Sequence, residues 1–181
     1  MIYMNNKMQT ISGDQLFESQ RFRVVRLVEQ CHDGISRTKD IIEHPGSVGI
    51  VPFVDNEKIC LIKVYRPAVG RKLIEIPAGT LDRTESLQAA AARELREETG
   101  YKCDLLESLG ELWMSPGILH ERMHLFVAKG LQSGCQALEP SEYIEPRVVH
   151  LSEAIEMCHN GMIEDAKTIA ALFRAEYWLR S

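Results

Sequence analysis

The sequence predicts an α/β sandwich in which a mixed sheet packs against helices, with an additional β extension at the N-terminal end. Two observations predict this fold class. Short β-rich runs stand on both sides of one central amphipathic helix, and two further helical patterns follow near the C-terminal end. The length of 181 residues suits one domain with a sizeable core and a short extension. We therefore expect the β extension over residues 1–45 and the α/β domain over residues 46–181.

The strands are expected from runs of β-branched and aromatic residues that alternate with polar ones or are apolar throughout. The first dozen residues are polar, and we expect no regular structure there. Alternation then extends over residues 22–39, interrupted by Asp33-Gly34, a dipeptide that favours a hairpin turn. A second hairpin is expected at Asp55-Asn56-Glu57. The remaining strands are expected at residues 47–54, 59–65, 73–76, 105–112, 123–130 and 147–151.

The clearest helix is expected over residues 85–99, where apolar side chains recur at helical spacing on one face. Asp82 and Thr84 are its two candidate N-cap residues, because their side-chain oxygens can accept hydrogen bonds from the first backbone N–H groups of a helix. Gly100 stands where a helix commonly ends in a left-handed conformation. The two late helices are expected at residues 152–161 and 165–179.

Composition and charge exclude several classes of protein. The 21 basic and 26 acidic residues give a net charge of −5, which argues against general binding to nucleic acids or to anionic membranes. The first residues contain no long apolar run of the kind found in secretory signals, and no stretch is long enough to cross a bilayer. The five cysteines are scattered and never form a CxxC pair, so we expect reduced thiols and a cytoplasmic protein.

Three glutamates, Glu94, Glu97 and Glu98, indicate a metal site on the central helix. Their spacing of three and four residues sets the carboxylates on one face of a helix. Unpaired like charges at this spacing destabilise a helix, so their presence suggests a cation between them. Hard carboxylate oxygens suit Mg²⁺ or Mn²⁺. The alternative is a solvated acidic helix with ion pairs such as Arg93–Glu97.

Residues 79–101, GTLDRTESLQAAAARELREETGY, resemble the Nudix box, G-x5-E-x7-R-E-U-x-E-E-x-G-U, in which U is a bulky apolar residue. Tyr101 fills the last of these U positions as an aromatic residue. The positions that carry the resemblance are Gly79, Glu85, Arg93, Glu94, Glu97, Glu98 and Gly100. The resemblance implies a Nudix-type α/β/α sandwich and an enzyme that hydrolyses a nucleoside diphosphate linked to another group. It also implies Mg²⁺ as the cofactor, with Mn²⁺ as an alternative.

The resemblance further implies which residues of the box bind the metal. Glu94 and Glu98 are expected as ligands, and Glu97 is expected to be a further ligand or a catalytic acid beside the metal. The backbone carbonyl of Ala78, just before the box, is expected as another ligand. These four residues form the predicted metal site.

Other residues of the box are expected to have structural roles. Gly79 is expected to adopt an irregular φ and to allow the close approach of metal or phosphate. Arg93 is expected to hold Glu85 and Glu97 in register through forked hydrogen bonds. Gly100 is expected to end the helix.

Residues upstream of the box resemble one branch of the family. Val64-Tyr65-Arg66-Pro67 and Glu75-Ile76-Pro77-Ala78-Gly79 look like the Q-Y-R and E-L-P-A-G runs of ADP-ribose pyrophosphatases and related nucleotide-sugar hydrolases. Val64 replaces the usual glutamine. Arg66 keeps its charge, and the resemblance implies that it holds a substrate phosphate. The alternative role for Arg66 is a surface ion pair.

Three downstream features agree with this branch. Pro116 stands 16 residues after Gly100, a distance that is typical of ADP-ribose-type members, although Pro116-Gly117 is also simply a turn. Glu121 is expected to contact the substrate or to support the metal site. Asp165-Ala166-Lys167-Thr168 matches the start of the last helix of the family, where we expect a structural role.

The acidic segment at residues 139–145 resembles the loop that provides the catalytic base in this branch. A base on a mobile loop can close over bound substrate. Glu142 is the first candidate for the base, and Glu139 is the second. The alternative is a solvated acidic loop.

We therefore expect a metal-dependent hydrolase of nucleoside diphosphate sugars, with ADP-ribose as the first candidate substrate and GDP-mannose close behind. The alternatives are hydrolysis of non-canonical nucleoside triphosphates and non-catalytic sensing of a nucleotide sugar. Sequence patterns of the coenzyme A and NADH branches are absent. As in the family, the N-terminal hairpin is expected to exchange between two subunits and to complete the nucleoside pocket. We thus expect a homodimer formed through the region of Phe17, Phe22 and Arg26.

Overall fold

The computed structural model of the protein describes residues 13–140 and 142–180. The polar start, for which we expected no regular structure, lies outside the described residues, as does Ser141 in the acidic segment. The strands are β1 (Asp14–Glu18), β2 (Arg23–Gln30), β3 (Ser36–Glu43), β4 (Ser47–Pro52), β5 (Lys58–Arg66), β6 (Arg71–Glu75), β7 (Ala78–Thr80), β8 (Leu105–Ser115), β9 (Leu119–Lys129) and β10 (Ile144–His150). The helices are α1 (Leu87–Thr99), α2 (Leu151–His159) and α3 (Ala166–Leu179).

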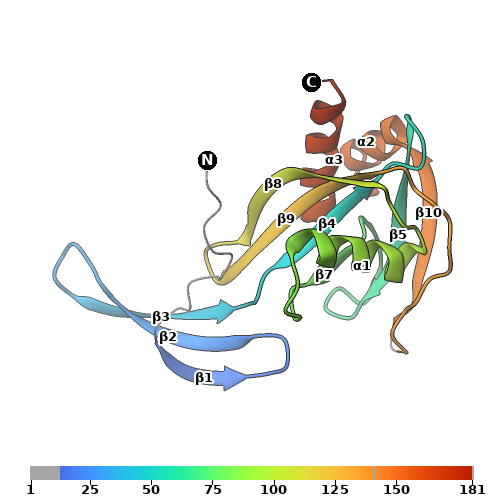
Figure 1. Ribbon diagram of the computed structural model, residues 1–181. Coiled ribbons are helices and arrows are strands. Elements are labelled where there is room, and N and C mark those ends of the chain that lie inside the picture. The colour runs from blue at the N-terminus through green and yellow to red at the C-terminus, as the bar shows by residue number, and fades with distance from the viewer. Residues whose placement is uncertain (1–12, 141, 181) are drawn as a thin grey trace.

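Two sheets organise the described residues (Figure 1). The larger sheet has seven strands in the order β1-β2-β3-β9-β4-β7, and β8 is also paired with β9. The β4–β9 pair is parallel and the β8–β9 pair is antiparallel, so this sheet is mixed. The smaller sheet has three antiparallel strands in the order β10-β5-β6. The predicted α/β fold with a mixed sheet is confirmed.

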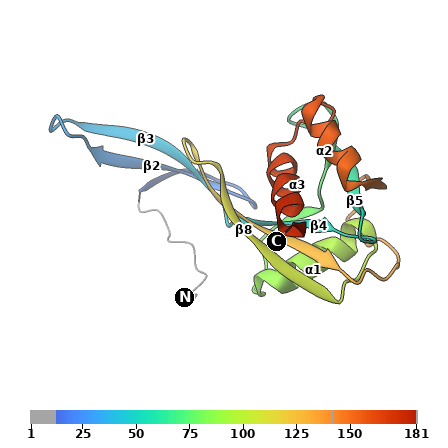
Figure 2. The ribbon, with the colours of Figure 1, turned by 90° about the horizontal axis from the view of Figure 1, so that it is seen from above.

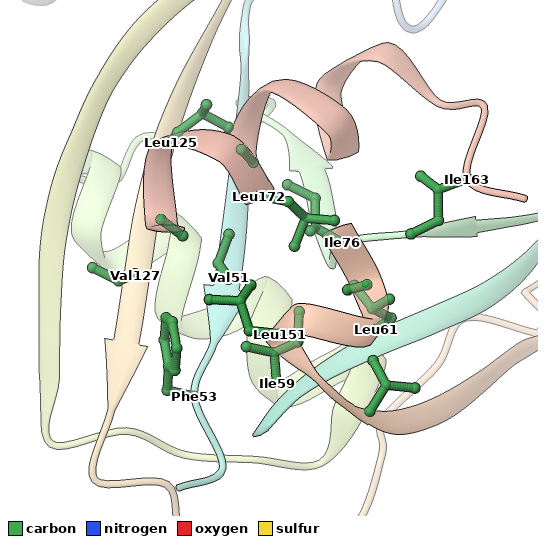
Figure 3. Close-up of a cluster of buried hydrophobic side chains, with 14 of the residues drawn as sticks. Val51, Phe53, Ile59, Leu61, Ile76, Leu125, Val127, Leu151, Ile163 and Leu172 are labelled. Carbon is green, nitrogen blue, oxygen red and sulfur yellow. The ribbon is translucent and has the colours of Figure 1, made fainter. Parts of the chain in front are cut away.

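Helices cover both faces of the larger sheet, because side chains alternate along its central strands (Figures 1 and 2). Ile50 of β4 packs in one cluster with Ala91 and Leu95 of α1. The next residue, Val51, belongs to a second cluster with β5, α2 and α3. Each fully buried aliphatic or aromatic side chain stabilises this arrangement by on the order of 2 kcal/mol. Figure 3 labels Val51, Phe53, Ile59, Leu61, Ile76, Leu125, Val127, Leu151, Ile163 and Leu172 of the second cluster.

The hairpin expected at residues 55–57 forms only its turn. Asp55 Oδ1 accepts hydrogen bonds from the backbone N–H groups two and three residues further on, at 2.9 and 2.7 Å. Phe53 and Ile59, on either side of this turn, make an isolated bridge. Beyond the bridge the two strands separate, β4 into the larger sheet and β5 into the smaller one. The prediction of two paired strands was wrong, because both strands are largely buried and find their partners far along the chain.

Helix α1 begins slightly later than expected. Its N-cap is Ser86, whose Oγ accepts a hydrogen bond from the backbone N–H three residues on, at 3.1 Å. Neither Asp82 nor Thr84 is the cap, because residues 82–85 do not enter the helix. The predicted left-handed end at Gly100 is confirmed by its φ of 79°.

Strands β1, β2 and β3 form an antiparallel extension that leaves the body of the molecule on one side (Figures 1 and 2). The predicted turn at Asp33-Gly34 connects β2 and β3, with Gly34 at a φ of 77°. Ile42 and Glu43 of β3 join the extension to the body by pairing with the start of β9. Strand β1 was not expected, because its sequence, DQLFE, does not alternate apolar and polar residues. Across the described residues, the three helices are too short or too polar to cross a membrane.

Candidate active site

A cleft of about 320 Å³ lies where α1, β7, the loop between β1 and β2, the end of β5 and the segment after β9 meet. Its lining contains five glutamates and four arginines, which come from parts of the sequence that are far apart. The structure thus brings together the box glutamates, Arg66 and both candidate bases. The residues that line the cleft are Gln20, Arg21, Pro45, Arg66, Ala78, Gly79, Thr80, Asp82, Arg83, Arg93, Glu94, Glu97, Glu98, Glu139 and Glu142.

Glu98 is the most deeply buried acid of this cleft, with 6% of its surface exposed. Its Oε2 accepts a hydrogen bond from the backbone N–H of Ala78 at 2.9 Å. Burial raises the pKa of Glu98 to about 8; the Ala78 N–H opposes this rise, while the charges of Glu94 and Glu142 add to it. The carboxyl group of Glu98 therefore holds a proton near neutral pH unless a cation lies beside it.

Arg93 connects three carboxylates of the box. Its Nε and Nη2 donate to Glu85 Oε1 at 3.0 and 2.8 Å. Its Nη1 donates to Glu94 Oε1 at 2.7 Å and to Glu97 Oε2 at 2.9 Å. Burial opposes the charge of Arg93, but these hydrogen bonds hold its pKa above the usual range. The contacts agree with the structural role expected for Arg93 and extend it to Glu94.

Of the two reasons expected for Gly79, the irregular φ is wrong, and the close approach of metal or phosphate stays a prediction. Its φ lies outside the left-handed region, and the residue belongs to β7, so it does not serve an irregular backbone conformation. Instead, a Cβ atom at this position would lie 1.9 Å from Cδ of Glu94 and 2.1 Å from its Oε1. Any side chain at position 79 would therefore displace the carboxylate of Glu94.

The cleft offers the oxygen ligands that suit a divalent cation, although they do not converge on one point in this structure. Across the described residues, no three histidine, cysteine or acidic side chains are arranged to hold a metal ion. Arg93 holds the carboxylates of Glu94 and Glu97, and Ala78 holds that of Glu98. The chemistry of this donor set nevertheless fits Mg²⁺ or Mn²⁺, because a divalent cation would keep the buried Glu98 ionised and offset the repulsion among the three acids.

Arg66 lies at the cleft with 40% of its side chain exposed. Its Nε and Nη2 donate to the two carboxylate oxygens of Glu75 at 2.8 and 2.6 Å. Burial opposes the charge of Glu75, but the hydrogen bonds from Arg66 and Lys167 hold the pKa of this carboxyl below its usual range. Arg66 therefore forms an ion pair, as in the alternative considered above, but the pair is with a fully buried acid and leaves part of the guanidinium at the cleft.

The two candidate bases, Glu139 and Glu142, lie in one tight turn at the cleft. The backbone N–H of Glu142 donates to the carbonyl of Glu139, and the backbone N–H of Glu139 donates to Glu142 Oε2, both at 2.9 Å. The charge of Glu142 helps to raise the pKa of Glu94 and of Glu98, which places this carboxylate within electrostatic reach of the box. The expected acidic loop is shorter than predicted, because β10 begins at Ile144.

A segment that sequence reasoning missed fastens this turn to α1. Gln136 Nε2 donates to the backbone carbonyls of Glu98 at 2.6 Å and of Ile144 at 3.2 Å. The backbone N–H of Ala137 donates to the carbonyl of Glu97 at 3.0 Å. The pattern of strands and helices gives no signal for such contacts, because they join a loop to backbone atoms elsewhere.

Glu121 does not line the cleft. Its Oε1 accepts a hydrogen bond from Ser47 Oγ at 2.6 Å and lies 3.8 Å from His44 Nδ1. These contacts join β9 to the start of β4 and to the segment that leaves the N-terminal extension. Contact between Glu121 and the substrate stays a prediction, and this arrangement gives it no support.

A second cavity, of about 440 Å³, adjoins the cleft beneath the loop between β1 and β2. Gln20, Arg21, Pro45 and Asp82 line both spaces. The N-terminal extension therefore contributes side chains to the candidate site within one chain. Sequence reasoning did not find Gln20 or Arg21, because they stand in a loop without a motif.

Comparison with known sequences agrees with this geometry. The NUDIX domain matches residues 43–172. The chain is 34% identical over 169 residues to a methanol dehydrogenase activator from Bacillus methanolicus, which covers 91% of this chain and 90% of that protein. It is 31% identical over 166 residues to an ADP-ribose pyrophosphatase from Bacillus subtilis (strain 168), again with 91% and 90% covered.

Comparison with solved structures agrees with the fold. The crystal structure of an ADP compounds hydrolase matches this chain with a TM-score of 0.80 and 24% identity, over 96% of this chain and 97% of that one. The domain match includes the whole of the box, and both sequence relatives exceed 30% identity over nearly their full length. The chain therefore belongs to the NUDIX domain family.

Proposed function

We propose that this protein hydrolyses the pyrophosphate linkage of nucleoside diphosphate sugars to a nucleoside monophosphate and a sugar phosphate, with ADP-ribose as the leading substrate. One observation carries the proposal. The three box acids, the two acids of the 139–142 turn and Arg66 line a single cleft. The name of the ADP-ribose pyrophosphatase from Bacillus subtilis supports the choice of substrate.

The cofactor in this proposal is Mg²⁺, with Mn²⁺ as the alternative, held by Glu94, Glu97, Glu98 and the carbonyl of Ala78. When bound, such an ion polarises phosphoryl oxygens and lowers the pKa of a coordinated water. Arg93 contacts Oε1 of Glu94 and Oε2 of Glu97, so the second oxygen of each carboxylate would face the ion while Arg93 keeps both side chains in place.

The remaining steps belong to side chains of the cleft. Arg66 binds a substrate phosphate through the part of its guanidinium that Glu75 leaves open. Glu142 accepts a proton from the attacking water as the water oxygen bonds to one phosphorus and the bridging P–O bond breaks. Glu142 is preferred to Glu139 because its charge acts on both Glu94 and Glu98.

We further propose that the nucleoside lies in the adjoining cavity formed by the N-terminal extension. Phe22 and Arg21 line this cavity together with Leu81 and Asp82, which follow β7 in the box. An aromatic ring and a cation near the phosphates suit a base and a ribose. The extension over residues 1–45 would then complete the substrate pocket of the domain at residues 46–181.

The same extension is proposed to form a homodimer. Its strands β1 and β2 expose the large apolar side chains of Leu16, Phe17 and Val28, and the β2–β3 turn exposes that of Ile35, by 46–64% each. Exposed apolar side chains gathered on one extension are typical of an interface. Sedimentation equilibrium gives a dimer mass if this is correct, and a monomer at micromolar concentration contradicts it. The net charge of −5 supports a protein without nucleic-acid or membrane partners. We also propose a cytoplasmic location, which the scattered cysteines without a CxxC pair support.

The test is chromatographic analysis of products from ADP-ribose, GDP-mannose and other nucleotide sugars with Mg²⁺. Two monophosphates are expected, and activity should be lost on Glu98→Gln. Release of pyrophosphate from nucleoside triphosphates would instead favour hydrolysis of non-canonical nucleotides. Tight binding of ADP-ribose by calorimetry without turnover would favour a sensor. Turnover of none of the nucleotide sugars refutes the proposed activity.

A further inference from the structure

Behind Arg66 lies a buried group of charges that the proposed reaction does not use. Glu75, at the end of β6, has no exposed surface, and Lys167, in the first turn of α3, exposes 8% of its surface. The Lys167 ammonium donates to Glu75 Oε2, the same oxygen that accepts from Arg66 Nη2. Lys167 Nζ also lies 2.9 Å from Asp165 Oδ1. Four alternating charges thus connect the start of α3 with the cleft.

The order of these charges decides how much positive charge Arg66 presents to the cleft. Arg66 and Glu75 alone would be a neutral pair, with the guanidinium satisfied by its buried partner. Lys167 is a second cation beside Glu75. Arg66 therefore neutralises a smaller part of the negative charge of this carboxylate. Without Lys167, the group would have a surplus negative charge beside a cleft that already contains five glutamates. Such a charge would repel an anionic substrate.

The position of Lys167 is fixed by the start of its helix. Asp165 caps α3, accepting hydrogen bonds at Oδ2 from the backbone N–H and the hydroxyl of Thr168, at 3.0 and 2.5 Å. The same hydroxyl oxygen accepts a hydrogen bond from the backbone N–H of Ile76 at 2.9 Å. Because Ile76 follows Glu75 directly, this hydrogen bond fixes the position of Lys167 on α3 relative to its partner Glu75.

We propose that Lys167 is a positioning residue for substrate binding that acts through Glu75 to keep the guanidinium of Arg66 oriented and positively charged toward a substrate phosphate. The choice of a phosphate as the partner of Arg66 rests on the proposed function. The connection from Lys167 to Arg66 rests on the contacts alone.

The first test is a double-mutant cycle on the binding of inorganic pyrophosphate in the presence of Mg²⁺, measured by calorimetry. Lys167→Met and Arg66→Gln are each expected to weaken binding by roughly tenfold or more, as for the loss of one charged hydrogen bond. The double variant is expected to bind no more weakly than Arg66→Gln, because Lys167 has no effect once Arg66 is absent. If the double variant loses affinity for pyrophosphate by the product of the two single losses, the proposal is overturned.

The second test uses the opposite change of charge. Asp165→Asn keeps an oxygen that caps α3 but removes the negative charge beside Lys167, so pyrophosphate is expected to bind more tightly. A purely structural role for this group predicts weaker binding for Asp165→Asn as well as for Lys167→Met. Weaker binding by Asp165→Asn at unchanged melting temperature would therefore overturn the proposal. If Lys167→Met does not fold, Lys167→Gln takes its place and Asp165→Asn still decides.

Arg71→Gln is the matched control. Arg71 begins β6, and its Nη1 lies 2.6 Å from Glu164, the neighbour of Asp165, in an exposed ion pair. Its removal is expected to leave pyrophosphate affinity within about twofold, as for most surface pairs. A loss equal to that of Lys167→Met would show a general charge effect and overturn the proposal.

Because pyrophosphate has neither base nor sugar, this result is independent of the substrate panel. If wild-type protein binds pyrophosphate and the cycle behaves as expected, but no nucleotide sugar is hydrolysed, the proposed function fails and the role of Lys167 stands. If nucleotide sugars are hydrolysed and the losses multiply, the proposed function stands and the role of Lys167 fails. Absence of pyrophosphate binding by wild-type protein would also overturn that role.

Discussion

Helix α1 and the turn at residues 139–142 supply carboxylates to the same cleft, but they hold them differently. On α1, the side chains of Glu94 and Glu97 are 13% and 22% exposed, and both accept hydrogen bonds from Arg93. In the turn, Glu139 and Glu142 are exposed, and the carboxylate of Glu142 bonds to the backbone of the same turn. The carboxylates of Glu94 and Glu97 thus belong to one network around Arg93, whereas those of Glu139 and Glu142 are exposed to solvent.

This difference matches what the two sets of acids would do. Metal ligands act only if they are held in a defined geometry by other contacts. A base that acts after the substrate has bound benefits from a segment that can close. The turn is nevertheless fastened at its base, since Gln136 ties it to the last residues of α1. Substitutions in the two regions should therefore affect different steps of the reaction.

The largest effect is expected for Glu98→Gln on α1. Glutamine can still accept the hydrogen bond from Ala78 N–H, so the fold should be kept, but the proposed metal site loses a charged ligand. A catalytic metal contributes several kcal/mol, so kcat/KM should fall by roughly 10³-fold or more. Melting temperature and calorimetric titration with Mg²⁺ separate loss of metal from loss of fold. A variant with near wild-type activity would remove Glu98 from the metal site.

The next largest effect is expected in the turn. Glu142→Gln removes the proposed base and should lower kcat by about 10² to 10⁴-fold. Its affinity for Mg²⁺, measured by calorimetry, should change little, because the α1 acids are untouched. Glu139→Gln is the matched control in the same turn and should retain activity within about fivefold, far less than the loss expected from removing a base. The reverse order of the two losses would make Glu139 the base.

The α1 region was also the more predictable from sequence. The spacing of Glu94, Glu97 and Glu98 fixes their common face on any helix, so the cluster follows from the period alone. The interaction of Arg93 with Glu85 and Glu97 is equally local. The need for glycine at position 79 could not be predicted from local sequence, because the side chain that would clash with a Cβ there is Glu94, on another element.

Residues that reach the site through tertiary pairing could not be predicted in this way. Glu75 lies on a short strand, and its buried partner Lys167 comes from the last helix. No period or turn signal connects two such positions. Similarly, the residue pattern around the turn at Asp55 predicted a hairpin, while the separation of β4 and β5 into two sheets depends on β9 and β10. Local sequence patterns thus predicted the elements and turns, whereas contacts between residues far apart in the sequence assemble these parts of the site.

The role of Gly79 predicts the next effect. In Gly79→Ala the added Cβ would overlap the carboxylate of Glu94, so this proposed metal ligand must move. Displacing a ligand or its support typically lowers metal affinity by about 10- to 100-fold. Calorimetric titration with Mg²⁺ measures the loss. Gly117→Ala is the control, because a Cβ there meets no atom within 4 Å and the φ is ordinary, so it should bind Mg²⁺ normally. Equal affinities for both variants would contradict the steric explanation.

A smaller effect is expected from pH on the metal-free protein. The pKa of Glu98 is about 8 in the folded state and roughly 4.3 in an unfolded chain. Between these values the folded state keeps a proton that the unfolded chain releases, so stability falls as pH rises toward 8. Bound Mg²⁺ replaces that proton, so the increase in melting temperature on adding Mg²⁺ should grow from pH 5 to pH 8. In Glu98→Gln the pH-dependent part of this increase should become smaller, and the raised pKa of Glu94 accounts for the part that remains. A constant increase in wild-type protein would refute this account.

The smallest effect is expected at the start of α1, where the rigid region begins. Ser86→Ala removes the Oγ that accepts the backbone N–H of Ala89, and loss of an N-cap costs about 1 kcal/mol. For a chain of this size that corresponds to a fall in melting temperature of roughly 2–4 °C. Activity should stay within about twofold, because three turns of helix separate the cap from Glu98. Thr84→Ala is the control, since Thr84 was a cap candidate from sequence but lies outside the helix, and its stability should change by less than about 0.5 kcal/mol. If Thr84→Ala were the more damaging change, the helix would begin where the sequence pattern placed it, and the register of the box acids relative to their cap would have to be redrawn.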